Sequence, residues 1–597
     1  MDKNSAIGLT LIAVLLGAYF YFFSPPPVPP ETKRVVQELP IKNDTLSQKK
    51  PGQTVDSLVA KQYGSLSSFL TGKESLTTVE NDVLKLTFSN HATFSEVNLK
   101  KYKTYHRQPL NLIGGGNNSF SLFADYQGRK IDLLSLRYQP ETSKKGDTTV
   151  VSFVARLSEN AYLKHTYAIP ATGYQVGYKV ESKGVTFTDK NIAFEWVDNI
   201  PLVEKDINKD SRSKTTINYY TGAGSFDGLS ETAADVESRT ISEPLKWVAI
   251  RQKFFLSAIL AKNNFVSGSI ASSVNPADSL VVKKAEVNLF IPAEAIASNQ
   301  AKFAYYFGPN DYRITSTIAE SFSRNVYLGW PPVIWVNKFL LIPVFNFLQK
   351  FISNFGVIII LLVLFMKLLL MPLTYTSYMG MAKMRLLKPE LDAIKEKNGD
   401  NMAQAQQDQM KLYKQVGVNP FAGCIPLLLQ FPIIISMFYL FPNSIDLRQQ
   451  PFLWADDLST YDSIITLPFI VPFGFGSHVS LFLLLMTASQ LIFQWQNNQL
   501  QAVQGPMKAM GYVMPIIFMF MLNSFSAGLN FYYFVSNLIT FAQQAIIKRF
   551  VDEDKIKAIM DENRKKVASG TSKKSKFMTK LEEAMKSGEE ARKKTKK

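Results

Sequence analysis

Residues 358–373 read IIILLVLFMKLLLMPL, an apolar run that contains one charged side chain, Lys367. With its flanks, from about 354 to 376, this run is long enough to cross the roughly 30 Å hydrocarbon core of a bilayer as an α-helix. The stretch therefore predicts a membrane-spanning helix. A chain of 597 residues has room for several domains, and further apolar runs lie on both sides of this one. The net charge of the chain is +17.

Five more segments are candidate spans, at 5–23, 424–441, 478–495, 510–526 and 528–547. The first is followed by a proline-rich stretch and by no small-residue cleavage site, which favours an uncleaved N-terminal anchor (1–23) over a signal peptide. Residues 331–350 are mostly apolar with polar residues toward one side and Trp330 and Trp335 at the start, which predicts a helix lying in the membrane interface. Packing under a soluble domain is the alternative for this helix.

A different pattern fills the chain between the anchor and these spans. After a polar, proline-rich linker (24–50), residues 51–330 show period-two alternation, for example at Tyr174, Val176, Tyr178 and Val180. The region predicts a large antiparallel β domain built as a sandwich or double sandwich. The fold class that follows is a polytopic α-helical membrane protein carrying a large all-β domain.

The charges of the loops predict the orientation. Residues 377–419 contain seven Lys and Arg, whereas residues 441–477 contain one, Arg448. By the positive-inside rule the first loop is cytoplasmic, so both termini are cytoplasmic and the β domain and 441–477 lie outside.

Two basic segments on the cytoplasmic side are candidate docking surfaces. The loop 377–419 predicts a methionine-bearing helical hairpin with a turn at 398–400, which either docks a partner or packs on itself. Its candidate docking cations are Lys383, Arg385, Lys388 and Lys395. The tail (549–597) carries fifteen Lys and Arg against six Asp and Glu from 555 onward, which suits either ribosomal RNA or anionic lipid.

Lys367 lies near the middle of its predicted span, and no other predicted span contains an Asp or Glu. A membrane cation without a counter-ion must become neutral or be hydrated in a cavity. Polar residues of neighbouring spans, Ser489 and Thr540 among them, favour a hydrophilic groove, although hydrogen bonding between helices also accounts for each of them. The other candidate groove residues are Gln430, Gln490, Tyr532, Tyr533, Ser536 and Asn537.

Several chemistries are not expected. The single cysteine, Cys424, excludes an intramolecular disulfide, and four scattered histidines provide no metal-binding or catalytic pattern. The P-loop pattern GxxxxGK[ST] does not occur. We therefore expect no cofactor, no metal, no small-molecule substrate and no enzymatic activity.

Two motifs resemble those of a known family. NPFAGCIPLLLQFP at 419–432 and SAGLNFYYFVSN at 526–537 are similar to the signatures of the YidC/Oxa/Alb membrane protein insertases. The anchor and external β domain resemble the Gram-negative form, whose periplasmic domain is a β-supersandwich similar to galactose mutarotases. Bacterial members usually carry an arginine where this chain has Lys367.

The resemblance implies a five-helix core (351–548), a periplasmic domain (51–330) and insertion of nascent membrane proteins into the bacterial inner membrane. It implies that Lys367 lines a groove open to cytosol and lipid, and that the Sec translocon, the ribosome and membrane lipids are partners. Two rival hypotheses are a secondary transporter using Lys367 as an ion site and an envelope binding protein acting through its β domain.

Overall fold

The computed structural model describes residues 61–233, 235–399, 401–418, 425–472, 475–500 and 506–569. The chain divides into two compact units: Met1–Tyr327 with Asn443–Ile445, called here the β unit, and Leu328–Pro442 with Asp446–Lys597, called the helical unit. The predicted anchor, the linker and the tail beyond 569 lie outside the described residues, as do residues 419–424 of the first motif.

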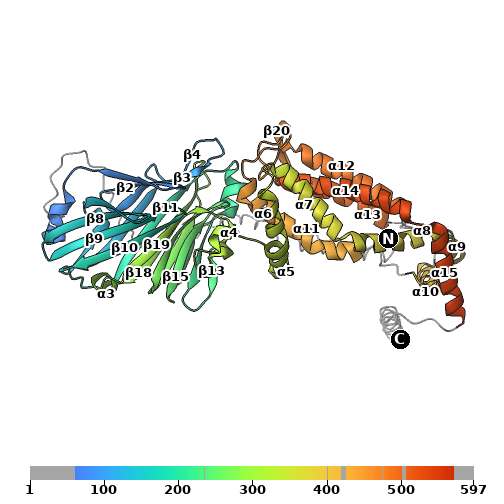
Figure 1. The fold of residues 1–597 in the computed structure, drawn as a ribbon, viewed down its shortest axis with the longest axis horizontal. Coiled ribbons are helices and arrows are strands. Elements are labelled where there is room, and N and C mark those ends of the chain that lie inside the picture. The colour runs from blue at the N-terminus through green and yellow to red at the C-terminus, as the bar shows by residue number, and fades with distance from the viewer. Residues whose placement is uncertain are drawn as a thin grey trace, which may run out of the picture. The chain divides into compact units, whose positions relative to one another are not determined.

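The β unit contains three sheets whose paired strands all run antiparallel (Figure 1). The nine-stranded sheet has the order β13-β12-β15-β16-β19-β10-β9-β8-β7, the six-stranded sheet β14-β17-β18-β11-β5-β6, and the four-stranded sheet β1-β2-β3-β4. The predicted large β domain is therefore confirmed. The strands of the largest sheet are β7 (Gln139–Lys145), β8 (Thr148–Ser158), β9 (Ala161–Pro170), β10 (Gln175–Lys183), β12 (Thr216–Thr221), β13 (Phe226–Gly228), β15 (Leu245–Arg251), β16 (Phe255–Phe265) and β19 (Lys302–Pro309).

The remaining strands complete the other two sheets. They are β5 (Asn118–Tyr126), β6 (Arg129–Asp132), β11 (Asn191–Pro201), β14 (Glu237–Ile241), β17 (Gly268–Ser273) and β18 (Val281–Pro292) in the six-stranded sheet, and β1 (Leu76–Glu80), β2 (Leu84–Ser89), β3 (Thr93–Lys103) and β4 (Pro109–Ile113) in the four-stranded sheet. Two short helices, α3 (Ala293–Ala297) and α4 (Tyr312–Thr315), lie between and after the last strands.

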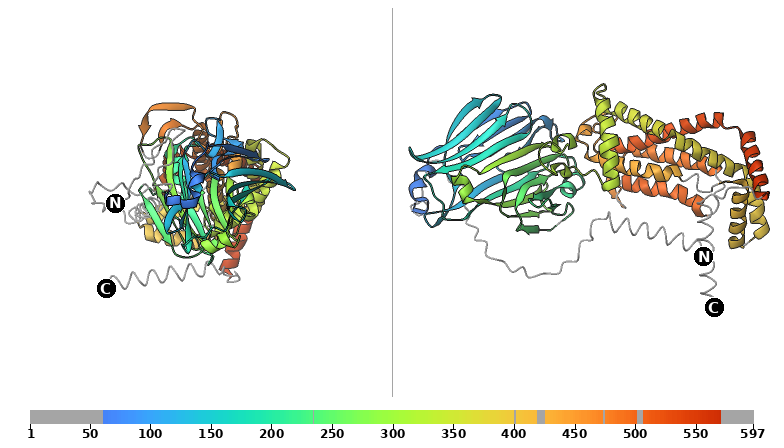
Figure 2. Two further views of the ribbon diagram at one scale, coloured as in Figure 1. Left: turned by 90° about the vertical axis from the view of Figure 1, so that its left-hand side faces the viewer. Right: turned by 60° about the horizontal axis from the view of Figure 1, so that its bottom comes forward.

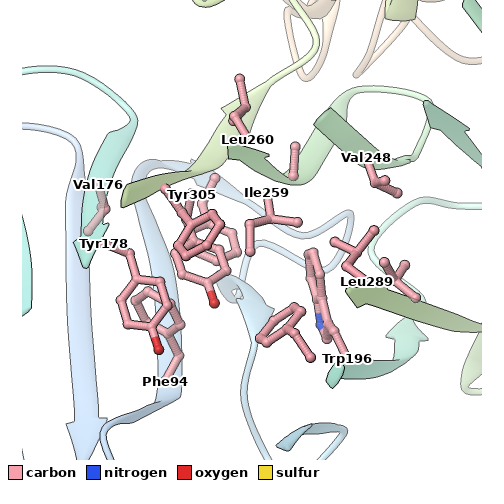
Figure 3. Close-up of a cluster of buried hydrophobic side chains, with 14 of the residues drawn as sticks. Phe94, Val176, Tyr178, Trp196, Val248, Ile259, Leu260, Leu289 and Tyr305 are labelled. Atoms are coloured by element: carbon pink, nitrogen blue, oxygen red, sulfur yellow. The ribbon is translucent and has the colours of Figure 1, made fainter. Parts of the chain in front are cut away.

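Alternating side chains build the core of the β unit. In β10 the buried apolar residues are Val176, Tyr178 and Val180, which are positions that the sequence alternation marks. Figure 3 shows Tyr178 beside Phe94, and Trp196 of β11 near Leu289 of β18. Aromatic rings and branched aliphatic chains from all three sheets thus share one apolar cluster, which provides the main stabilisation of the unit.

A histidine and an aspartate are enclosed in this core. His165 of β9 is hydrogen-bonded through Nδ1 to the Tyr178 hydroxyl at 2.9 Å and through Nε2 to the Tyr138 hydroxyl at 3.1 Å. Asp198 of β11 accepts a hydrogen bond from the Asn118 side-chain amide at 3.3 Å. Burial lowers the pKa of His165 to about 3 and raises the pKa of Asp198 to about 8. The cause in both cases is that the core lacks the water that would stabilise the charged form.

The two outermost strands of the nine-stranded sheet differ from the interior ones. Strand β7 has the sequence QPETSKK, and all seven of its residues are exposed. Strand β13, at the opposite edge, has three residues. Charged residues, proline and shortness are the features by which open sheet edges avoid further pairing.

The helical unit consists of packed helices and one small hairpin (Figure 1, Figure 2). Its central helices are α7 (Phe355–Leu369), α11 (Ile425–Asn443), α12 (Leu481–Leu500), α13 (Pro506–Leu522) and α14 (Ala527–Phe550). An apolar core joins α7, α11, α12 and α14 around Leu362, Met437, Phe482 and Leu529. The peripheral elements are α5 (Pro331–Val336), a π-helical turn (Asn337–Leu341), α6 (Ile342–Gln349), α8 (Met371–Leu386), α9 (Lys388–Asn398), α10 (Met402–Val416), α15 (Glu553–Ala568) and the strands β20 (Ile465–Val471) and β21 (Gly476–Val479).

The structure differs from the expectation of one straight span at 354–376. Helix α7 ends at Leu369, and α8 continues from Met371 at an angle of 61°. Pro372, in the first turn of α8, explains the break because proline has no amide hydrogen and disfavours helical geometry in the residue before it. Lys367 therefore lies in the last turn of α7 and not in the middle of a continuous helix.

Length and apolarity alone do not test the predicted number of six spans. Among the described residues, the continuous helix Pro331–Gln349 is long and apolar enough to cross a membrane, and the bent pair Phe355–Leu369 and Met371–Leu386 passes the same test when taken as one span.

Candidate functional site

The ammonium group of Lys367 is held by a hydroxyl group. Its Nζ donates a hydrogen bond to Thr540 Oγ1 of α14 at 2.9 Å, and Thr540 Oγ1 in turn donates to the carbonyl of Ser536 at 2.7 Å. Within the described ranges Lys367 forms no ion pair, in agreement with the absence of acidic residues from the predicted spans. In the described part of the chain, the side-chain partner of Lys367 Nζ is thus a neutral hydroxyl group.

Helix α14 also binds the main chain of Lys367. The side-chain amide of Gln543 donates to the Lys367 carbonyl at 3.0 Å, while the other amide atom, Gln543 Oε1, is buried without a hydrogen-bond partner among the described residues. Carbonyl groups in the last turn of a helix lack the usual partner four residues ahead, so a side chain from a neighbouring helix can satisfy one of them. The end of α7 is consequently fixed to α14 at two points.

Two of the predicted groove residues, Ser536 and Asn537, lie on one turn of α14. Ser536 is buried and bonded to Thr540, and Asn537 donates to Ser489 Oγ of α12 at 2.9 Å. Lys367, Ser536, Asn537 and Thr540 form a polar cluster. The cluster joins α14 to α7 through Lys367 and to α12 through Ser489.

The two predicted tyrosines lie closer to the start of α14. Tyr533 donates its hydroxyl hydrogen to the carbonyl of Ile434 in α11 at 3.3 Å. Tyr532 is buried, and its ring centroid lies 5.7 Å from that of Phe441 in the apolar core. In this structure Tyr532 thus packs inside the helical unit and does not line an open surface, because its ring is enclosed by apolar residues of α11 and α14.

The remaining candidates are less connected. Gln430 and Gln490 are partly exposed, and the structure gives neither a hydrogen bond within its described residues. Gln543 is not among the predicted groove residues, although its spacing of three and seven residues from Thr540 and Ser536 places all three on one helical face.

The predicted cytoplasmic hairpin is α9 and α10, and a third helix packs against it. Leu391, Leu412 and Val416 of the hairpin form an apolar cluster with Ile556 and Met560 of α15. Polar contacts join α15 to α8 and to the hairpin: Arg385 of α8 forms an ion pair with Glu553, Arg564 forms one with Glu390 of α9 at 2.5 Å, and Asn563 donates to the carbonyl of Val416 in α10 at 3.2 Å.

This cluster of α9, α10 and α15 changes the interpretation of the basic segments. We expected the chain from 549 onward to be one basic tail, but residues 553–568 form a helix of the cluster because Ile556 and Met560 bury an apolar face there. Of the candidate docking cations, Arg385 is paired internally and Lys383 is partly buried, whereas Lys388 and Lys395 are exposed. In the part of the chain that is described, no three His, Cys, Asp or Glu side chains are placed to hold a metal ion.

Comparison with known proteins identifies relatives along almost the full chain. The family model described as 60Kd inner membrane protein matches residues 347–555, and the YidC periplasmic domain model matches residues 76–342. The membrane protein insertase YidC of Amoebophilus asiaticus is 43% identical over 98% of this chain and 98% of its own length, and that of Cytophaga hutchinsonii is 42% identical over 99% and 98%. A solved structure of a putative aldose 1-epimerase from Escherichia coli covers 40% of this chain and 100% of its own at 12% identity, with a TM-score of 0.25 that supports no argument. As the two motifs predict, the chain belongs to the family of YidC membrane protein insertases.

Proposed function

We propose that this chain inserts newly made proteins into the inner membrane by means of the polar cluster around Lys367. The relatives are named membrane protein insertases, and they match this chain over nearly their whole length. The observation that carries the proposal for this chain is the hydrogen bond of Lys367 to Thr540, since the charge has a hydroxyl and no carboxylate as its partner. Such a site is able to exchange its neutral partner for a polar or acidic group of an incoming segment.

The mechanism is one of solvation. A hydrophilic flank of a nascent segment costs several kcal/mol per polar group when it enters hydrocarbon without hydrogen bonds. Lys367, Ser536 and Asn537 offer hydrogen-bonding partners at that depth, and the apolar part of the segment then gains roughly 0.8 kcal/mol per buried methylene group in lipid. No nucleotide or covalent chemistry enters this scheme, so we propose a non-enzymatic insertase.

The proposed topology has six spans with both termini in the cytosol. In it α5 and α6 lie in the outer interface: Val333, Asn337, Leu341 and Phe345 are buried on one face, whereas Trp335, Phe339 and Phe347 are exposed on the other. An exposed aromatic stripe beside polar residues suits the boundary between headgroups and acyl chains.

We further propose that Lys388 and Lys395, with the basic residues after 569, hold the ribosome near the cytosolic side. The Sec translocon and membrane lipids are the other proposed partners. Contacts of this type depend on charge and weaken as the salt concentration rises.

A substitution series at Lys367 tests the proposal. Insertion of a small membrane-protein substrate is measured in a host depleted of its own insertase, with wild type, Lys367→Arg, Lys367→Ala and Lys367→Glu. We expect Arg to support insertion and Ala and Glu to fail, since a positive charge is required. Lys350→Ala is the matched control, because Lys350 is an exposed lysine outside the polar cluster, and this variant is expected to behave as wild type.

Insertion by Lys367→Ala at the wild-type level would overturn the proposed role of the charge. Flux of a small solute or ion through liposomes containing this chain alone, without integration of any polypeptide, would instead establish a transporter.

A further inference from the structure

The hairpin of β20 and β21 exposes apolar side chains on both of its faces. Phe469 is 61% exposed and Ile470 is 80% exposed, and successive strand residues point to opposite faces. The segment from 463 to 480 contains no Lys, Arg, Asp or Glu. An isolated two-stranded hairpin is marginally stable in water, and an exposed patch of apolar side chains marks a surface that contacts another apolar phase.

The base of the hairpin is firmly attached to the ends of the central helices. Asn523, after α13, donates to the carbonyls of Phe475 and His478 at 2.9 and 2.6 Å, and its carbonyl accepts from His478 Nε2 at 2.9 Å. On the other side Asp462 accepts from the backbone amides of Leu481 and Phe482 at the start of α12. The apolar strand is thus held in a fixed position and is not a loosely tethered loop.

The hairpin lies at the same end of the helical unit as α5 and α6, and at the opposite end from α9, α10 and α15 (Figure 1). The helix pair exposes the aromatic stripe of Trp335, Phe339 and Phe347 at this level, and the hairpin exposes Phe469 and Ile470. Two separate elements of one unit therefore present aromatic and branched apolar groups where the helices end.

The side chains of β20 favour contact with lipid over contact with a second protein. Pro468 has no amide hydrogen and its position in the strand hinders the addition of another strand along it. The absence of charged residues excludes an electrostatic docking site for an acidic or basic partner. Apolar and aromatic side chains without charge bind acyl chains and the adjoining carbonyl region of phospholipids.

We propose that the hairpin of β20 and β21 is inserted in the outer leaflet of the membrane, with Phe469 and Ile470 among the upper acyl chains. The hairpin and the helices α5 and α6 then fix the depth of the helical unit from two places. This inference rests on the proposed topology, in which residues 441–477 lie on the outer side.

The test uses the full-length chain with Cys424→Ala, in which Ile470→Cys carries an environment-sensitive fluorophore. The chain is reconstituted in phosphatidylcholine vesicles containing spin labels at a shallow or a deep acyl position. We expect quenching by the shallow label to be at least about twofold stronger than that of a fluorophore at Ser143→Cys on the exposed strand β7. Because the hairpin carries no charge, quenching should not change with salt or with added anionic lipid.

A fluorophore at Phe339→Cys separates the possible failures. If Phe339 is quenched by lipid spin labels and Ile470 is quenched only by aqueous iodide, the inference about the hairpin is wrong and the proposed topology stands. If the fluorophores at both positions are quenched only by aqueous iodide, the proposed topology itself is wrong. A fluorophore at position 470 that is protected from iodide in native membranes but not in vesicles would show that a protein covers the hairpin. This result would also overturn the inference.

A second variant tests the apolar requirement directly. With the fluorophore at Phe469→Cys, Ile470→Asp is expected to move the emission toward that in water, whereas Ile470→Leu should leave it unchanged. Equal emission from the two variants would contradict insertion of this strand.

Discussion

His165 and Asp198 change protonation in opposite directions when the β unit unfolds. The folded pKa of His165 is about 3 against an ordinary value of 6.5, so the unfolded chain binds an extra proton between these pH values and stability rises with pH there. The folded pKa of Asp198 is about 8 against 3.8, so the folded chain holds the extra proton and stability falls as pH rises through that window. The two effects oppose each other up to pH 6.5, above which the contribution of His165 no longer changes and that of Asp198 continues to fall.

We therefore expect the stability of the β unit to fall by about 2 kcal/mol between pH 6.5 and 8, and Asp198→Asn to remove this dependence. The measurement is amide hydrogen exchange of β11 in the full chain, corrected for its intrinsic pH dependence. The exposed Asp189 provides the matched control, since Asp189→Asn should keep the wild-type slope. The same slope in Asp198→Asn and wild type would contradict the buried, protonated state of Asp198.

Replacement of Thr540 should lower the stability of the helical unit. Thr540→Val preserves the side-chain shape but removes the acceptor of the Lys367 ammonium group, which should cost roughly 1–3 kcal/mol because a partly buried charge loses its partner. The expected result is a lower thermal unfolding temperature of the helical unit in detergent. Thr540→Ser keeps the hydroxyl and should restore most of the loss, whereas equal stability of the Val and Ser variants would show that the hydrogen bond contributes nothing.

Sequence identified Lys367 because one charge in a long apolar run has no ordinary explanation. Ser536 and Asn537 followed from their polarity in a predicted span and from the family motif. The helical face that Gln543 shares with Ser536 and Thr540 was visible in the sequence, but its bond to the Lys367 carbonyl was not, since that bond depends on where α7 ends. That end was itself hidden: residues 358–373 are continuously apolar apart from Lys367, and Pro372 alone signals the break.

At the scale of elements, helix α15 depends on its apolar face. Ile556→Ala should weaken its packing on α9 and α10 by about 2–4 kcal/mol, as expected for a buried branched side chain. Hydrogen exchange of the α15 amides measures the effect. Ile559, on the exposed side of the same helix, is the control, and Ile559→Ala should leave the exchange nearly unchanged.

The ion pairs around α15 should matter less. Arg385 and Glu553 are both partly exposed, so Arg385→Ala is expected to cost less than about 1 kcal/mol. A loss from Arg385→Ala as large as that from Ile556→Ala would show that charge, and not apolar packing, holds α15 in place.

Elements with a regular apolar pattern were predictable, and elements hidden by composition were not. The alternation at 174–180 predicted β10, and the helical spacing of apolar residues within each arm of 377–419, with a turn at 398–400, predicted the hairpin. Helix α15 was overlooked because the surrounding lysines dominate the sequence and only Ile556 and Met560 mark its buried face. The strands β20 and β21 were overlooked because a short segment between two predicted spans was taken to be a loop.

At the scale of the whole molecule, the two units have separate apolar cores. If insertion resides in the helical unit, deletion of residues 50–310 should leave more than about half of the wild-type insertion of a small substrate, since units with their own cores fold separately. Lys367→Ala in the shortened chain is the control and should abolish the remaining insertion. Loss of all activity on deletion, with the helical unit still folded, would favour an envelope binding protein acting through its β domain.

Strand β7 has a further consequence for a protein that works among unfolded polypeptides. Extended clients carry unpaired amides and carbonyls, and an ordinary open sheet edge would capture them by strand addition. The outermost strand here contains Pro140, Glu141, Lys144 and Lys145 and is exposed along its full length. This edge of the nine-stranded sheet can therefore stand beside incompletely folded chains without capturing them, or a second copy of itself, by strand addition.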